Sequence, residues 1–200
     1  MDKSLQKNNQ NGSQVLGIYE TTKTPLKHIR VSRLGSQDIR FIGKDGYGNF
    51  DIDGVEDRTK KTLKMTVLHV EMIICKDFYL FNENFKKYQQ MAEVIFLDGN
   101  NKLSGMVVKT ESLGNLLTVL RRIEMDGKNA KEVIIEARSV DRVNDKNKYS
   151  AMEFDVVGDV KKEVTKEVQM LFTDHQDILF AASRWLTGQM KIIPREEADA

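Results

Sequence analysis

The order of β-rich and helical stretches in the middle of this chain is what most limits how it can fold. Residues 91–97 form a short β-rich run, and residues 98–101 (Asp-Gly-Asn-Asn) then supply side chains that tolerate the positive φ angles of a hairpin turn. Residues 103–109 return as a second strand, and residues 111–124 form an amphipathic helix. Alternating apolar residues between 133 and 156 then indicate two antiparallel strands, each with one buried face.

The longest strand candidate precedes this run, at residues 61–74. Its alternation predicts that Thr66, Leu68, Val70, Met72 and Ile74 share one face of a sheet.

The helix has a start signal in Thr110 or Ser112 and a stop signal in Gly127. The C-terminal region reads as helix from about 160 to 186, and Thr173-Asp174 can cap a second helix and split it in two. Together these patterns divide the chain into a polar leader expected to be disordered (1–14), an N-terminal extension with a β-hairpin (15–60), a β-domain (61–158), a C-terminal helical region (159–188) and an acidic tail (189–200).

Composition narrows the function classes. The chain has 200 residues, a net charge of +1, three histidines and the single cysteine Cys75, so neither an intrachain disulfide nor a metal-ligand spacing is expected. No apolar run is long enough to span a membrane and the first residues are polar, which predicts a soluble protein of the cytoplasm without a membrane partner. Because the known catalytic and phosphate-binding motifs are missing, we expect no enzyme activity and no cofactor.

The segment 75–90 carries the first candidate binding surface, because it interleaves aromatic rings with lysines. Aromatic faces for bases and cations for phosphates are the pairing by which proteins hold single-stranded nucleic acids. The alternative is that some of these rings, Phe78 and Phe81 above all, close one end of the β-domain as core. The candidate residues are Lys76, Phe78, Tyr79, Phe85, Lys86, Lys87 and Tyr88.

The turn between the last two strands is the second candidate, since its cations can follow a nucleic-acid backbone and its tyrosine begins a strand on the non-core face. A solvated hairpin end has a similar composition, so both readings stay open. Lys109, at the end of the strand before the helix, is expected to lie on the same groove. The candidates are Lys109, Arg138, Arg142, Lys146, Lys148 and Tyr149.

Three stretches, residues 93–99, 107–116 and 148–149, carry a family likeness. Over about residues 62–157 the chain resembles phage-type single-stranded DNA-binding proteins of the oligonucleotide/oligosaccharide-binding (OB) fold. The resemblance implies a mainly β, α+β architecture: a five-stranded antiparallel barrel with a helix between strands 3 and 4, here extended by an N-terminal hairpin and a C-terminal helix. The acidic residues 195–200 lack the apolar tip with which bacterial members of the family end.

The function implied by this resemblance is the coating of single-stranded DNA without strong sequence preference during phage replication or recombination. Single-stranded DNA and replication proteins would be the partners, in the cytoplasm of a bacterial host. The alternative is a structural or assembly protein, such as a virion component, that self-associates through its C-terminal helix. The sequence leaves DNA and RNA open, because a contact to the 2′-hydroxyl depends on one side chain in an unknown place.

Overall fold

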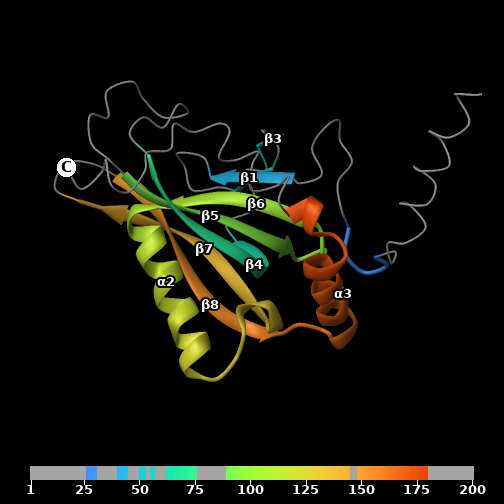
Figure 1. Cartoon of the computed structure of the whole chain (residues 1–200). Helices are drawn as coiled ribbons and strands as arrows, with labels where there is room; N and C mark the ends of the chain where they lie inside the picture. The colour runs from blue at the N-terminus through green and yellow to red at the C-terminus, as the bar shows by residue number, and fades with distance from the viewer. Residues whose placement is uncertain are drawn as a thin grey trace, which may run out of the picture.

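The computed structural model describes residues 26–30, 40–44, 50–52, 55–56, 62–75, 89–144 and 148–179 (Figure 1). Its elements are, in chain order, β1 (Arg40–Lys44), β2 (Phe50–Ile52), β3 (Val55–Glu56), β4 (Thr62–Cys75), β5 (Gln89–Asp98), β6 (Leu103–Lys109), α2 (Thr110–Met125), the 3-10 turn η1 (Ala130–Glu132), β7 (Val133–Val143), β8 (Lys148–Asp159) and α3 (Lys162–Thr173).

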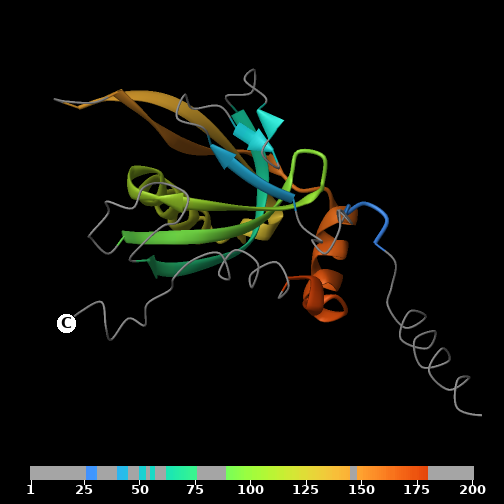
Figure 2. The same ribbon diagram turned by 90° about the horizontal axis from the view of Figure 1, so that it is seen from above.

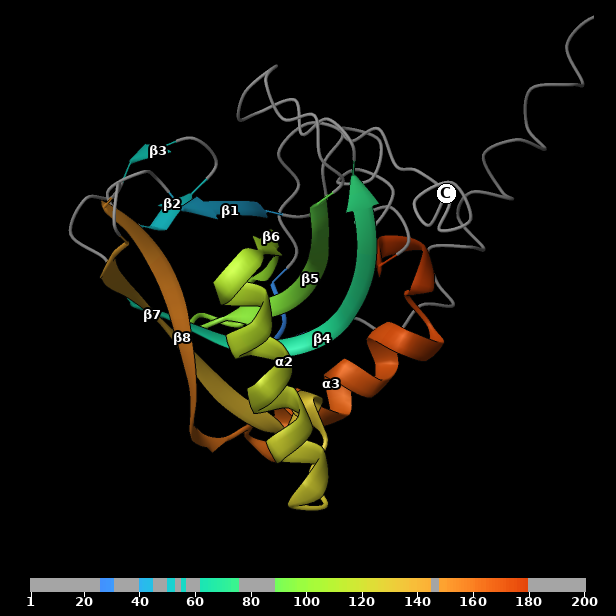
Figure 3. The same cartoon turned by 90° about the vertical axis from the view of Figure 1, so that its left-hand side faces the viewer.

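Five strands form an antiparallel sheet in the order β6-β5-β4-β7-β8. The long strand β4 is central: residues 65–75 pair with β5, while residues 62–65 also pair with β7. The sheet therefore curls, and Figure 3 shows α2 lying between β8 and β4 on its concave side. The predicted α+β class and the helix between the third and fourth of these strands are confirmed.

Backbone pairing between β6 and β8, which would close the sheet into a barrel, is not found among the described residues. The edge strands β6 and β8 each have other hydrogen-bond partners. Along β6, Arg40 and Phe41 of β1 pair in parallel with Ser104 and Gly105. On β8, the backbone N–H of Met152 donates to Ser112 Oγ (2.9 Å) and its carbonyl accepts from Asn115 Nδ2 (2.9 Å).

The helix α2 confirms one of its two sequence signals. Gly127, with φ of +71°, ends it: the N–H groups of Gly127 and Lys128 donate to the carbonyls of Glu124 and Ile123, a pattern that satisfies the free carbonyls of a helix end. The helix begins at Thr110, one of the two predicted start residues, but the expected side-chain cap is wrong, because no side chain caps this terminus. The Ser112 hydroxyl is used by Met152 instead.

The predicted face of β4 is also wrong, because the strand contains a bulge. Its register with β5 shifts between Val67 and His69, so Leu68 is an extra residue. Val67 and Val70 therefore face the concave core, while Leu68 packs on the opposite face of the sheet.

The sheet is buried on both faces around β5. On the concave face, α2 packs its apolar stripe against β4–β8, and on the other face α3 covers β4, β5 and β6. All of residues 91–98 are buried: Ile95 and Leu97 pack against α3, whereas Met91 packs with Ile73 and Val107. The α3 side of this layer uses the apolar residues that the sequence predicted, namely Val164, Val168 and Leu171.

The predicted split of the C-terminal helix is confirmed. The helix α3 ends at Thr173, Asp174 is a turn residue, and residues 176–179 are helical again. Glu167 of α3 also holds the segment 26–30, because its carboxylate accepts from the backbone N–H groups of Lys27, His28 and Ile29, each at 2.8 Å. Of the predicted N-terminal hairpin, residues 31–39 lie outside the described residues.

Candidate nucleic-acid interface

The predicted binding residues fall into two groups. Lys109, Arg138, Arg142, Lys148 and Tyr149 belong to described strands. The others lie outside the described residues: Lys76, Phe78, Tyr79, Phe85, Lys86, Lys87, Tyr88 and Lys146.

The strand ends that flank the two predicted loops lie on one side of the molecule. The end of β4, the start of β5 and the tip of the β7–β8 hairpin all lie on the left in Figures 1 and 2, and α2 begins on the same side. The helix α3 lies on the opposite side in both views. We call this left-hand side the loop end of the molecule. It unites Lys109, at the junction of β6 and α2, with Arg142 and Tyr149, which are register partners at the hairpin tip.

Arg142 lies at the centre of a polar cluster at the loop end. Its Nε donates to Glu111 Oε1 (2.9 Å) and its Nη2 donates to Glu153 Oε1 (2.7 Å). The Tyr149 hydroxyl donates to the second oxygen of Glu111 at 2.8 Å. Glu111 in the first turn of α2 therefore holds both Arg142 and Tyr149, while 41% of Tyr149 remains exposed.

The cluster continues along the hairpin as a chain of ion pairs. Arg138 Nη2 lies 3.2 Å from Asp155 Oδ2 and 3.7 Å from Glu153 Oε2. On the other side of Asp155, Arg122 Nη2 of α2 lies 3.8 Å from its Oδ1. The six residues Glu111, Arg122, Arg138, Arg142, Glu153 and Asp155, which we call the charge network, thus balance arginines against an equal number of carboxylates.

These contacts shift the ionisation of the groups at the hairpin tip. Hydrogen bonds from Arg142 and Tyr149 lower the pKa of Glu111 below its usual value. The same contact with Glu111 raises the pKa of the Tyr149 hydroxyl, and bonds to Glu153 and Glu111 raise the pKa of Arg142. Glu111 and Arg142 are therefore both charged at neutral pH, and the Tyr149 hydroxyl keeps its proton.

The two lysines of the site differ in their surroundings. Lys148, the first residue of β8, is exposed. Lys109 is half-buried, and this burial lowers the pKa of its ammonium group.

Reasoning from the sequence missed the carboxylates of the charge network. Glu153 follows from hairpin register, because it pairs with Arg138 across β7 and β8. No comparable signal in the sequence points to Glu111, which reaches Arg142 from a helix 31 positions away.

A buried carboxyl group, Glu93 at the middle of β5, was also missed. Its exposed fraction is 0%, and neither carboxyl oxygen has a hydrogen-bond partner within the part of the chain that the structure describes. Burial, and then the charge of Glu71 opposite it on β4, raise its pKa from 4.5 to about 8. Glu93 is thus mainly protonated at neutral pH.

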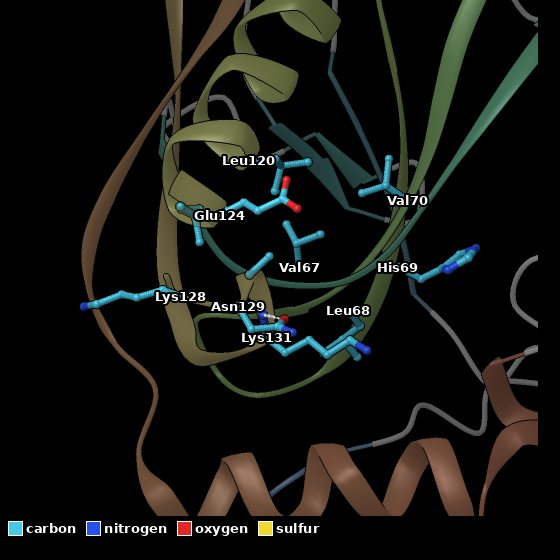
Figure 4. A pocket seen from close by; sticks show the side chains of 11 residues that line it. Val67, Leu68, His69, Val70, Leu120, Glu124, Lys128, Asn129 and Lys131 are labelled. Carbon is cyan, nitrogen blue, oxygen red and sulfur yellow. Dashed lines mark hydrogen bonds between the residues drawn. The ribbon is translucent and has the colours of Figure 1, made fainter. Parts of the chain in front are cut away.

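A cavity of about 400 Å³ lies between the bulged part of β4 and the end of α2 (Figure 4). Val67 and Leu120 point into it, whereas His69 and Lys128 point away (Figure 4). Lys128 pairs with Asp159 at 2.9 Å, and Lys131 lies 3.7 Å from the centre of the Phe172 ring. The lining mixes apolar side chains such as Val67 and Leu120 with polar ones such as Glu124, and both of its lysines make contacts of their own.

Neither a metal site nor a membrane-spanning helix is found in the described ranges. No group of three or more His, Cys, Asp or Glu side chains there can hold a metal ion. No helix there is long and apolar enough to cross a membrane.

Comparison with known proteins gave no match to a family model, a curated protein or a solved structure.

Proposed function

We propose that this protein binds single-stranded DNA without strong sequence preference, by stacking bases on aromatic rings and contacting phosphates at the loop end. The observation that carries the proposal is the convergence of the flanks of both aromatic-basic loops on that end (Figures 1 and 2). Tyr149 supports it, because a partly exposed ring held through its hydroxyl is a suitable stacking platform.

The connectivity of the sheet supports an OB-like architecture for this proposal. In that fold the first strand pairs with both the second and the fourth, as β4 does with β5 and β7. An OB-like barrel left open between β6 and β8 would still place the first and last interstrand loops at one end. The proposed biological role, coating of strands in phage replication or recombination in the host cytoplasm, follows from the family resemblance.

The position of α3 restricts where a strand can bind. Ile95, Leu97 and Leu103 on the outer face of β5 and β6 are buried against this helix. A single strand that crossed the middle of this face would have to displace it. We therefore confine the proposed contact to the loop end, and its footprint to a few nucleotides.

Titration with fluorescently labelled oligothymidylate at two salt concentrations tests the proposal. Binding tighter than micromolar that weakens as salt rises is expected. Lack of binding at low salt by the folded protein would refute it.

Variants of Tyr149 test the ring itself. Since a stacked base contributes about 1–3 kcal/mol, Tyr149→Ala should weaken binding about 5- to 150-fold. Tyr149→Phe keeps the ring and loses only the bond to Glu111, so it should retain most of the affinity. Met125→Ala, at an 87% exposed position at the far end of α2, should change nothing. Equal affinities for Tyr149→Ala and the wild type would exclude Tyr149 from the site.

The rival function, assembly through the C-terminal helix, has less support. The apolar stripe of α3 is buried against the sheet of its own chain, so Val164, Val168 and Leu171 are not free to form an interface. Measurement of molecular mass in solution decides between the two: a stable oligomer that does not bind oligonucleotide would favour the rival.

A further inference from the structure

Two carboxylates hold the side chain of Arg142 through charge-assisted hydrogen bonds, the type of bond that a guanidinium also makes to phosphate oxygens. Its Nε and Nη2 each donate to a different acid, Glu111 and Glu153, at 2.9 and 2.7 Å. Each acid takes one charge-assisted bond, at a length that arginine also uses with phosphate oxygens. The guanidinium is thus already oriented for an anion.

All three side chains are accessible from solvent. The exposed fractions are 31% for Arg142, 35% for Glu111 and 39% for Glu153. An anion arriving from solution can therefore reach Arg142 without unfolding any element. Because the charge network as a whole is neutral, with three arginines against three carboxylates, such an anion meets no net attraction there while both acids are in place.

We propose that Glu111 and Glu153 occupy a phosphate site at Arg142 in the unbound protein, and that a bound strand replaces one of these carboxylates with a backbone phosphate. This inference rests on the proposed function and deepens it, since it assigns a phosphate subsite and its internal competitors. The exchange of one anion for another at the same guanidinium leaves a displaced carboxylate near the phosphate, which weakens binding. The wild-type protein therefore binds a single strand more weakly than the cations of the loop end would bind it without these two acids.

Neutralising the two acids tests this directly. In Glu111→Gln/Glu153→Gln the new side chains keep the size of the old ones, and the amide oxygen at position 111 can still accept from Tyr149, so the ring stays in place. Arg142 becomes available for a phosphate. We expect oligothymidylate to bind about tenfold tighter at low salt, and the slope of log K against log salt to steepen by about 0.7, the value for one more phosphate contact on a single strand.

The matched control removes the same amount of charge elsewhere. Asp159 pairs with Lys128 by the C-terminal end of α2, at the bottom of Figures 1 and 3, and Glu163 is exposed in the first turn of α3. The double variant Asp159→Asn/Glu163→Gln therefore reports the effect of net charge alone. It should leave the salt slope at the wild-type value.

The outcomes separate this inference from the function on which it rests. If wild type and all variants fail to bind while remaining folded, the proposed function is refuted. If the wild type binds but the two double variants have the same affinity and slope, the phosphate site at Arg142 is refuted and the proposed function stands. Weaker binding by Glu111→Gln/Glu153→Gln would also overturn the inference, since the acids would then assist binding.

Discussion

Replacing Glu93 with glutamine should stabilise this protein at neutral pH. Glu93 pairs with Glu71 of β4 and Val107 of β6 and has no exposed surface, and its pKa is raised from 4.5 to about 8. In the unfolded chain the group regains its ordinary pKa and releases its proton at neutral pH. Folding must therefore take up a proton, and this costs free energy that increases with pH.

The size of this cost follows from the two pKa values. Stability linked to Glu93 is fully present below the unfolded pKa of 4.5 and is lost as pH rises toward the folded value of about 8. At about 1.4 kcal/mol per pH unit, the loss at pH 7 is about 3 kcal/mol. Glutamine resembles the protonated acid in shape and has no charge in either state, so Glu93→Gln avoids this loss.

Urea unfolding at about pH 4 and about pH 7 measures the effect. The free energies of unfolding of Glu93→Gln and wild type should be similar at the lower pH, and the variant should be more stable by about 3 kcal/mol at the higher pH. Glu163→Gln is the matched control, because it makes the same change at an exposed position in the first turn of α3, where charges contribute about 0–1 kcal/mol. A variant with the same pH dependence as the wild type would refute the burial of an unpaired acid at this position.

Three further predictions concern how the elements are held together. Glu167→Gln should lower the free energy of unfolding by about 2 kcal/mol at pH 7. Burial opposes ionisation of Glu167, but bonds from the N–H groups of Lys27, His28 and Ile29 outweigh it and lower its pKa, so the deficit should shrink as pH falls below about 4.5. A deficit that grows in acid would contradict this. Ser112→Ala should lower the free energy of unfolding in urea by about 1–2 kcal/mol, because it leaves the Met152 N–H unpaired. Its control Thr118→Ala, on the exposed side of α2, should cost less than about 0.5 kcal/mol. Equal effects would mean that Ser112 does not cover the edge of β8. Leu171→Ala should lower the free energy of unfolding by about 2–5 kcal/mol because the side chain is fully buried between α3 and the sheet; a change below about 1 kcal/mol would mean that α3 is not docked there.

Features set by short stretches of sequence were predicted well. The turn after β5 is closed by Asp98, whose Oδ1 accepts from the N–H groups of Asn100 and Lys102, and Asn101 adopts a φ of +58° there. Gly127 ends α2 for the same kind of reason. Such signals depend on the conformational preferences of a few neighbouring residues, and no distant part of the chain is needed to read them.

The candidate site was predicted only in part, because its electrostatics depend on distant partners. The sequence predicted that Arg138, Arg142 and Tyr149 belong to one hairpin, and the structure places them on its two strands, β7 and β8. It did not indicate that Arg142 and Tyr149 share Glu111, since that contact requires α2 to lie along β8. Two of the predicted phosphate-contacting cations, Arg138 and Arg142, are thus part of a neutral network.

By itself, the sequence determined the order of strands and helices from β4 onward, the turns and the apolar faces of the two helices, because each rests on local backbone preference and on a repeat of two or of about 3.6 residues. Only the tertiary structure decided the bulge at Leu68, the partners of the edges of β6 and β8, and the burial of Glu93. These depend on which elements meet in space, and on how much water their contact removes from a backbone group or a charge.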